Sequence, residues 1–191
     1  MDENDAAIVD RVRAGEVDAF RVLVGRHSRN LFGMAYRMTG NSDDADDIVQ
    51  ETFLRAYRQI DRFESRSSVG TWLYRIAANC ALDHMRSRKT RDEVSPDGDN
   101  AAGDGIEQYA DTGPSPDRGV YDAEIRDRVM DALDLLTPVE RTAFVMRHFQ
   151  DTPLAEIGRA LGLRENATKN TIFRAVQKLR RALQPLVGGA S

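Results

Sequence analysis

Five carboxylates fall within the nine residues from Asp43 to Glu51, and a cluster of this kind can bind a divalent cation. The stretch lacks the glycine-bearing loop of a calcium site. The three histidines lie far apart in sequence and Cys80 is the only cysteine, so we expect neither a set of zinc ligands nor a disulfide. A metal-dependent enzyme built on these acids is disfavoured, because no nucleophile or second ligand cluster accompanies them. We therefore expect no metal, no cofactor and no catalytic residue.

The same acidic stretch has a second interpretation as the beginning of a helix. Asn41 or Ser42 can cap the N-terminus, and acids in the first turns interact favourably with the helix dipole. Capping does not explain why polar and apolar side chains then recur at spacings of three and four residues. Such spacing forms one helix face that suits docking to a partner helix. The residues of this face are Asp47, Gln50, Glu51 and Leu54.

The stretch TWLYRIAANCALDHMRSR, residues 71–88, begins apolar and aromatic and ends basic. A helical wheel gives it an inward face of Leu73, Ile76, Ala77, Cys80, Ala81 and His84. The opposite face holds Trp72, Arg75, Asn79, Leu82 and Arg86. That face suits unpaired bases, because an aromatic ring stacks on them, arginine holds phosphate and an amide reads a base edge. A tryptophan is more often part of a core, so Trp72 has two interpretations.

Residues 153–183 have the spacing of a helix-turn-helix, whose second helix enters the major groove of DNA. Gly158 permits a close helix crossing and Gly162 a left-handed turn. The second helix has an apolar side of Thr168, Ile172, Ala175, Val176, Leu179 and Leu183, and a polar side of Asn170, Phe173, Arg174, Gln177, Arg180 and Arg181. A phenylalanine among these cations can pack against a thymine methyl. An ordinary basic helical hairpin is the alternative.

Charge is distributed in blocks along the chain. The net charge is −5 over residues 1–53, +6 over 54–91, −11 over 92–140 and +6 over 141–191, which leaves −4 for all 191 residues. Two basic blocks around an acidic spacer indicate two contacts with a polyanion, although either block alone is better explained as a solvated helix face.

No apolar run approaches the roughly 20 residues that span a bilayer, and the acidic start MDENDAAIVD does not have the pattern of a signal peptide. We therefore expect a cytoplasmic protein without membrane insertion. Helical periodicity from residue 6 to about 91 predicts about four helices. Residues 92–119 contain too few apolar side chains to offset the entropy of ordering. The prediction is an all-α chain of two small helical domains, 6–91 and 121–187, joined by a flexible acidic linker, 92–120, with the helix-turn-helix in the second.

In this order the three motifs resemble the extracytoplasmic-function (ECF) sigma factors, of the sigma-E-like kind, which keep only two conserved sigma domains. DADDIVQETFLRAY resembles region 2.2, and RFESRSSVGTWLYRIAANCALDHMRSR resembles regions 2.3 and 2.4. LTPVERTAFVMRHFQDTPLAEIGRALGL, with the helix after it, resembles region 4. The resemblance implies an alternative sigma factor, not an enzyme, that binds core RNA polymerase and directs promoter-specific initiation through -10 and -35 elements.

The resemblance also implies a role for each segment. The region 2.2 face docks on the clamp coiled coil of the polymerase beta-prime subunit, and the beta flap is the other part of core polymerase that the resemblance implies as a partner. The loop before the Trp72 helix, with the start of that helix, captures a base flipped from the -10 element. The implied -10 residues are Phe63, Trp72, Arg75, Asn79, Arg86, Arg88 and Lys89. The implied -35 residues are Lys169, Asn170, Phe173, Arg174 and Lys178.

The recognition helix departs from the family pattern, which commonly has an apolar residue near Thr168 and a basic one near Thr171. This leaves the -35 preference open. The resemblance further implies an anti-sigma factor, often membrane-bound, that masks both domains. The chief alternative function is a conventional helix-turn-helix regulator that binds duplex DNA tightly without polymerase, but it leaves the region 2.2 face and the linker unexplained.

Overall fold

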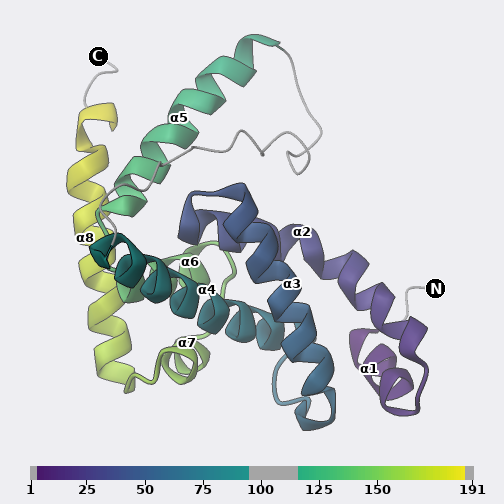
Figure 1. Cartoon of the computed structure of the whole chain (residues 1–191). Coiled ribbons are helices and arrows are strands. Elements are labelled where there is room, and N and C mark those ends of the chain that lie inside the picture. Colours follow the sequence, from purple (N-terminus) through teal and green to yellow (C-terminus); the bar gives the residue numbers. More distant parts are fainter. Residues whose placement is uncertain (1–3, 95–115, 188–191) are drawn as a thin grey trace. The chain divides into compact units, whose positions relative to one another are not determined.

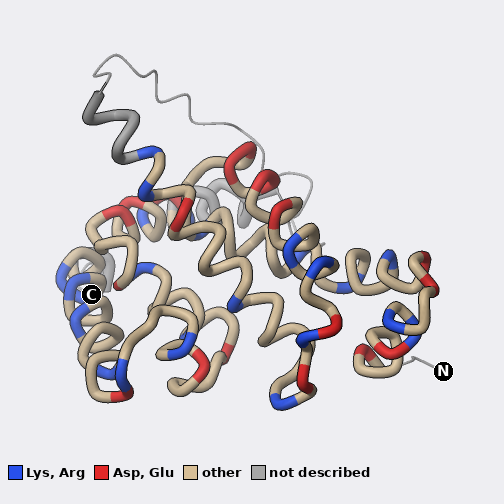
Figure 2. Tube along the Cα trace, turned by 60° about the horizontal axis from the view of Figure 1, so that its bottom comes forward, with Lys and Arg blue, Asp and Glu red and all other residues tan. Residues whose placement is uncertain are grey.

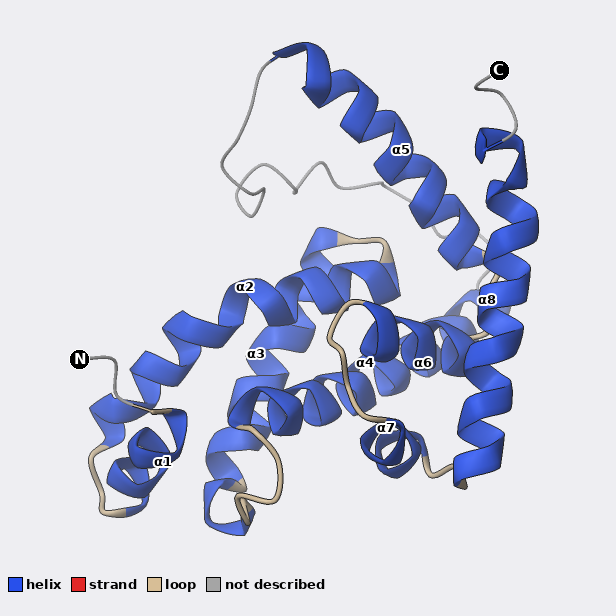
Figure 3. Ribbon diagram, turned by 180° about the vertical axis from the view of Figure 1, so that it is seen from behind, coloured by secondary structure: helices blue, strands red, loops and turns tan. Residues whose placement is uncertain are grey.

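The computed structural model describes the backbone of residues 4–94 and 116–187, and the side chains of residues 4–88 and 125–184. Over these residues the regular elements are helices without any strand (Figures 1 and 3). The chain divides into two compact units, Met1–Gly103 and Asp104–Ser191. The predicted all-α class with two helical domains is therefore confirmed. Most of the linker predicted at 92–120 lies outside the described residues.

The first unit contains four α-helices and two short 3-10 helices. They are α1 (Asp5–Arg13), η1 (Val17–Ala19), α2 (Phe20–Thr39), α3 (Ser42–Arg58), η2 (Ile60–Arg62) and α4 (Val69–Val94). Asn41 caps α3, since its side chain accepts a hydrogen bond from the Asp44 amide at 3.0 Å. Gly40 ends α2 in a left-handed conformation with φ of 71°, which glycine adopts without strain. The sharp turn between α2 and α3 is thus encoded in two adjacent residues.

Helices α2, α3 and α4 pack together and enclose the core of the first unit. Each contributes an apolar stripe, as the amphipathic spacing predicts. The buried side chains include Leu31 and Met34 of α2, Ile48 of α3 and Leu73 of α4. This packing holds the remaining faces of α3 and α4 toward solvent.

The second unit contains α5 (Pro116–Asp134), α6 (Pro138–His148), α7 (Leu154–Leu161) and α8 (Glu165–Val187). Thr137 and Glu140 form a capping box at the start of α6, with Pro138 in the first turn. The core of this unit includes Leu133, Met146 and Ile157. Helix α5 begins at Pro116, so the predicted linker includes the first residues of a helix.

Candidate nucleic-acid and polymerase interfaces

The predicted docking face on α3 is largely exposed. Asp47, Gln50 and Leu54 are all exposed, and the apolar Leu54 side chain is 53% exposed. Glu51 is half-buried and accepts a hydrogen bond from Arg55 at 2.6 Å. The face therefore presents two polar side chains and one apolar side chain to solvent, while Glu51 is paired within α3.

Helix α4 differs from its helical-wheel prediction at two positions. Trp72 and Leu82, placed on the outward face, are each only 5% exposed. The wheel assumes one covered face, but α4 is covered by α2 and α3 and also by Phe63 from the preceding loop, whose ring centroid lies 5.2 Å from that of Trp72. Trp72 is therefore a core residue of this structure.

The rest of the predicted outward face of α4 does reach solvent. Asn79 and Arg86 are exposed and Arg75 is half-buried. Arg75 and Asn79 are four residues apart and so share a side of the helix. The buried Cys80 is a packing residue, as predicted, and burial raises the pKa of its thiol.

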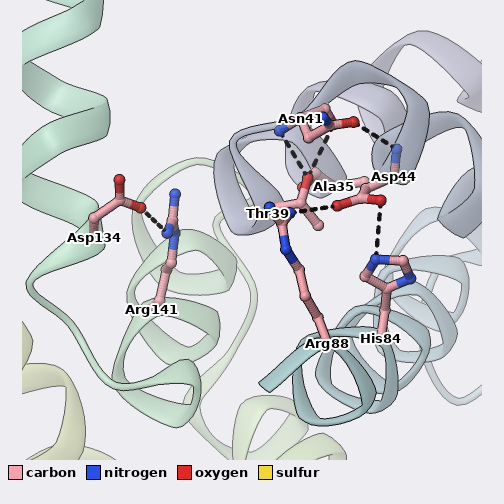
Figure 4. A network of polar contacts seen from close by, with 8 residues as sticks. All are labelled: Ala35, Thr39, Asn41, Asp44, His84, Arg88, Asp134 and Arg141. Carbon is pink, nitrogen blue, oxygen red and sulfur yellow. Dashed lines mark hydrogen bonds and ion pairs between the residues drawn. The ribbon is translucent and has the colours of Figure 1, made fainter. Parts of the chain in front are cut away.

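Asp44 of α3 forms polar contacts with the C-terminal half of α4 (Figure 4). Its carboxylate lies 2.9 Å from Arg88 Nη1 and 3.1 Å from His84 Nε2. His84, predicted to face inward, is thus half-buried in a polar contact. Arg88, a predicted phosphate contact, is paired with a carboxylate in the free chain. The side chain of Lys89 lies outside the described residues.

The loop between η2 and α4 has a buried beginning and an exposed middle. Phe63 is 5% exposed beneath the loop, whereas residues 64–66 are exposed. Ser68 ends the loop by accepting a hydrogen bond from the Thr71 amide at 3.1 Å, which caps α4. The contact of Phe63 with a flipped base stays a prediction and requires its packing against Trp72 to open.

Helix α8 presents a polar face that carries an exposed aromatic ring. Lys169, Asn170 and Arg174 are exposed and Phe173 is 62% exposed. Lys169 also pairs with Glu165 of the same helix at 2.5 Å. Basic residues recur along this helix (Figure 2). The combination of cations, an amide and an apolar ring suits both phosphates and base edges of duplex DNA.

Thr168 and Thr171, where the sequence departs from the family pattern, both face the interior. Thr168 is fully buried and Thr171 is 4% exposed. The Thr168 hydroxyl donates a hydrogen bond to the Arg164 carbonyl at 3.1 Å, so its polar group is satisfied within the helix. The unusual pair therefore belongs to the packing of α8.

Comparison with known proteins identifies both units. Residues 23–91 match the Sigma-70 region 2 family, and residues 126–179 match the family Sigma-70, region 4. The chain is 33% identical over 181 residues to the ECF RNA polymerase sigma factor SigW of Bacillus subtilis, which covers 93% of this chain and 96% of that protein. The chain belongs to the ECF sigma factor family. It is also 33% identical to the RNA polymerase sigma-H factor of Pseudomonas aeruginosa, over 97% of this chain and 96% of that one.

Solved structures agree with this assignment. The sigma factor resembles CnrH, solved in complex with the cytosolic domain of CnrY, with a TM-score of 0.66, 26% identity and coverage of 96% of this chain and 99% of that one. It shares its fold with RpoE from Bartonella quintana, at a TM-score of 0.67 and 24% identity over 86% of this chain and 96% of that one. The protein is thus an alternative sigma factor that directs promoter-specific transcription with RNA polymerase.

Region 4 of the sigma factor contains a buried carboxylate that the sequence analysis did not single out. Glu140 of α6 is 5% exposed, and its Oε2 lies 2.6 Å from Lys178 Nζ of α8. Its Oε1 lies 3.7 Å from Arg174 Nε. Two of the predicted -35 residues are therefore held by one acid, and Lys178 forms part of the contact between α6 and α8. The sequence pattern that points to Glu140 is T-x-x-E at residues 137–140, which is typical of a capping box.

The environment of Glu140 shifts its pKa in two opposing ways. Burial raises the pKa of the carboxyl, but hydrogen bonds from Lys178 and Thr137, with the charge of Lys178, lower it by more. The net result is a pKa below the ordinary value, so Glu140 is ionised at neutral pH.

The turn of the sigma factor's helix-turn-helix confirms both predicted glycine roles. Gly162 has φ of 65° at the end of α7. A Cβ at Gly158 would lie 2.8 Å from the Leu163 carbonyl oxygen and 3.1 Å from Thr168 Oγ1. Only glycine therefore allows α7 to approach the turn and α8 this closely.

The described parts of the sigma factor contain neither a cluster of metal ligands nor a membrane-spanning helix. Among residues 4–88 and 125–184, no three His, Cys, Asp or Glu side chains group together so as to hold a metal ion. The described helices also include none that is long and apolar enough to cross a membrane.

Proposed function

We propose that the sigma factor divides promoter recognition among three surfaces: the exposed face of α3 docks on core polymerase, α4 and the loop before it bind the -10 element, and α8 binds the -35 element. The observation that carries this proposal is that the helix bearing Asn79 and Arg75 is held in the core. Trp72 and Leu82 of the same helix, α4, are buried there. A polar face on a rigid element is pre-organised to select one DNA conformation.

The -10 surface would act on separated strands. Extruding a base from a duplex costs a few kcal/mol, so groups that bind the extruded base make strand opening depend on sequence. The Asn79 amide offers both a donor and an acceptor to a base edge. Arg75 and Arg86 would bind neighbouring phosphates, and Arg88 would join them by leaving Asp44.

The -35 surface would act on duplex DNA. Asn170 and Arg174 can read base edges in the major groove, and the exposed ring of Phe173 can pack against a thymine methyl. Lys169 would contact phosphate. Since Lys178 is paired with Glu140, we assign it to holding α8 in place, with at most a shared role toward phosphate.

The core-binding surface separates a sigma factor from a conventional helix-turn-helix regulator. Leu54, at 53% exposure between polar neighbours, can serve as an apolar anchor on a helix face that docks to a partner helix. We propose that this face binds the beta-prime clamp and that the second unit binds the beta flap. A conventional regulator binds duplex DNA without polymerase, so it does not need an exposed docking face on α3.

We propose three further properties from the family relationship. The protein acts in the cytoplasm, has no catalytic activity or cofactor of its own, and is regulated by an anti-sigma factor. The last property is supported by two proteins with this fold that were solved with a bound protein: RpoE of Bartonella quintana with the anti-sigma factor NepR, and CnrH with the cytosolic domain of CnrY.

Run-off transcription on a fragmented genome, with core polymerase and with or without this chain, tests the proposal. The expected result is a set of transcripts that appear only with the chain and share upstream -10 and -35 sequences. A chain with Gln50→Ala and Leu54→Ala should produce much less of each transcript at limiting core polymerase. Tight duplex binding with no dependence on polymerase would favour the conventional regulator.

A further inference from the structure

Arg13, in the last turn of α1, binds the backbone at the start of the loop that precedes α4. Its Nη2 donates hydrogen bonds to the Ile60 carbonyl at 2.9 Å, to the Asp61 carbonyl at 3.3 Å and to the Phe63 carbonyl. Its Nε donates to the Ile60 carbonyl at 3.2 Å. One guanidinium from a distant part of the chain therefore holds three carbonyls of η2 and the loop.

The chemistry of this contact is specific to arginine. The Ile60 carbonyl already accepts a hydrogen bond from the Phe63 amide at 3.2 Å, and Arg13 adds donors to it and to two carbonyls further along the chain. The planar guanidinium can do this because it offers five N–H groups in a fixed fork. Asp10, one turn earlier in α1, lies 3.5 Å from Arg13 Nη1 and helps to orient the group. A lysine could reach one of these carbonyls but could not form the same fork.

The held segment leads directly to the exposed part of the loop. Phe63 is fixed against Trp72 on one side, and Ser68 is fixed by its cap on α4 on the other. Between them Ser65 has φ of 53°, a left-handed conformation that costs a non-glycine residue energy and persists only where the surroundings impose it. Arg13 fixes the backbone two residues before Ser65, through its hydrogen bond to the Phe63 carbonyl.

We propose that Arg13 is a positioning residue for -10 recognition: without touching DNA, it fixes the beginning of the base-binding loop and so sets how strongly the sigma factor distinguishes one -10 base from another. The inference rests on the proposed -10 function of this loop and of α4. It adds a part of the chain outside the Sigma-70 region 2 match, which begins at residue 23.

A purely structural role for Arg13 makes a different prediction. If Arg13 only attached α1 to the domain, its loss would lower stability, core binding and activity on every promoter together. If it positions the loop, its loss changes the ratio of activities between promoters that differ at a -10 base. The ratio is therefore the informative measurement.

The experiment uses the full chain with core polymerase and promoter fragments whose -10 region is already unpaired. Open-complex formation is compared between a preferred fragment and fragments with one -10 base replaced. For Arg13→Lys, which keeps the charge, we expect the discrimination ratio to fall about fivefold, with core affinity unchanged. The matched control is Arg11→Gln in the same helix, because Arg11 forms an ion pair with Glu16 through its Nε and Nη2.

Each outcome bears on the proposal. A lower ratio for Arg13→Lys but not for Arg11→Gln supports it. An unchanged ratio, with or without a general loss of activity, overturns it. If Arg13→Lys binds core poorly, hydrogen exchange of the loop amides decides, since the proposal requires faster exchange there and unchanged exchange in α3. If the wild type itself shows no discrimination on unpaired fragments, the proposed -10 function fails.

Discussion

Glu140 Oε2 lies 2.6 Å from Lys178 Nζ, and this ion pair joins the first turn of α6 to the middle of the recognition helix α8. The same carboxylate accepts a hydrogen bond from the Thr137 amide at 3.0 Å and lies 3.7 Å from Arg174. A buried acid therefore caps one helix and fixes the position of another. The orientation of α8 toward DNA depends on a residue that faces the interior.

Glu140→Gln should destabilise the packing of α6 against α8 by about 1–3 kcal/mol, because it replaces a buried charge-assisted hydrogen bond by a neutral one. The measurement is hydrogen exchange of α8 amides in the full chain. Glu165→Gln is the control, since that carboxylate forms an exposed pair with Lys169 and should change exchange little. Equal exchange in the two variants would contradict the importance of the buried pair.

The same pair predicts a dependence of stability on pH. The pKa of Glu140 is lower in the folded protein than in the unfolded chain, so its contribution is fully present above the ordinary glutamate value of about 4.3. The contribution is lost as pH falls below that value and through the folded pKa. In wild type, hydrogen exchange of the α8 amides should therefore become faster in acid, and Glu140→Gln should lack this part of the increase. If the two proteins still differed in α8 exchange at a pH below the folded pKa of Glu140, ionisation of Glu140 would not explain the difference.

Gly158→Ala should destabilise the second unit by about 1–3 kcal/mol and weaken duplex binding to the -35 element. The new Cβ would meet the Leu163 carbonyl oxygen at 2.8 Å, and that atom belongs to the backbone of the turn. Gly25→Ala in α2 is the control, because a Cβ there has nothing within 4 Å and alanine favours a helix by about 0.5–1 kcal/mol. Thermal unfolding should therefore shift in opposite directions for the two variants.

Asn79→Ala should reduce open-complex formation while leaving affinity for core polymerase intact, because Asn79 is exposed on α4 and lies outside the docking face of α3. Asn170→Ala is the matched variant on α8. It should weaken binding to a -35 duplex by about 1–3 kcal/mol and leave binding to an unpaired -10 fragment unchanged. Parallel losses of core affinity and open-complex formation in Asn79→Ala would refute the division of labour.

Gln50→Ala combined with Leu54→Ala should weaken core binding by about tenfold or more, since both side chains are exposed on the predicted docking face. Gln59→Ala, at an exposed position just after α3, is the control. Titration of labelled chain with core polymerase measures both. Unchanged affinity in the double variant would place the core contact elsewhere.

Local patterns in the sequence predicted the features that depend on neighbouring residues. The cap at Thr137, the turn at Gly162 and the buried side of α8 all follow from short spacings and are present in the structure. Contacts between distant segments were not predictable in this way. The burial of Trp72 depends on Phe63, and the ion pair of Glu140 depends on a lysine 38 residues away. A helical wheel cannot show that a helix is covered on more than one side.

The burial of Thr168 bears on how recognition helices can be exchanged between sigma factors. Thr168 Oγ1 occupies the space beside Gly158, so its hydroxyl and the missing side chain of that glycine fit each other. A graft of α8 alone would bring this hydroxyl against an α7 shaped for a different neighbour. The smallest transplantable module is therefore the pair of helices with their turn, from Leu154 through α8.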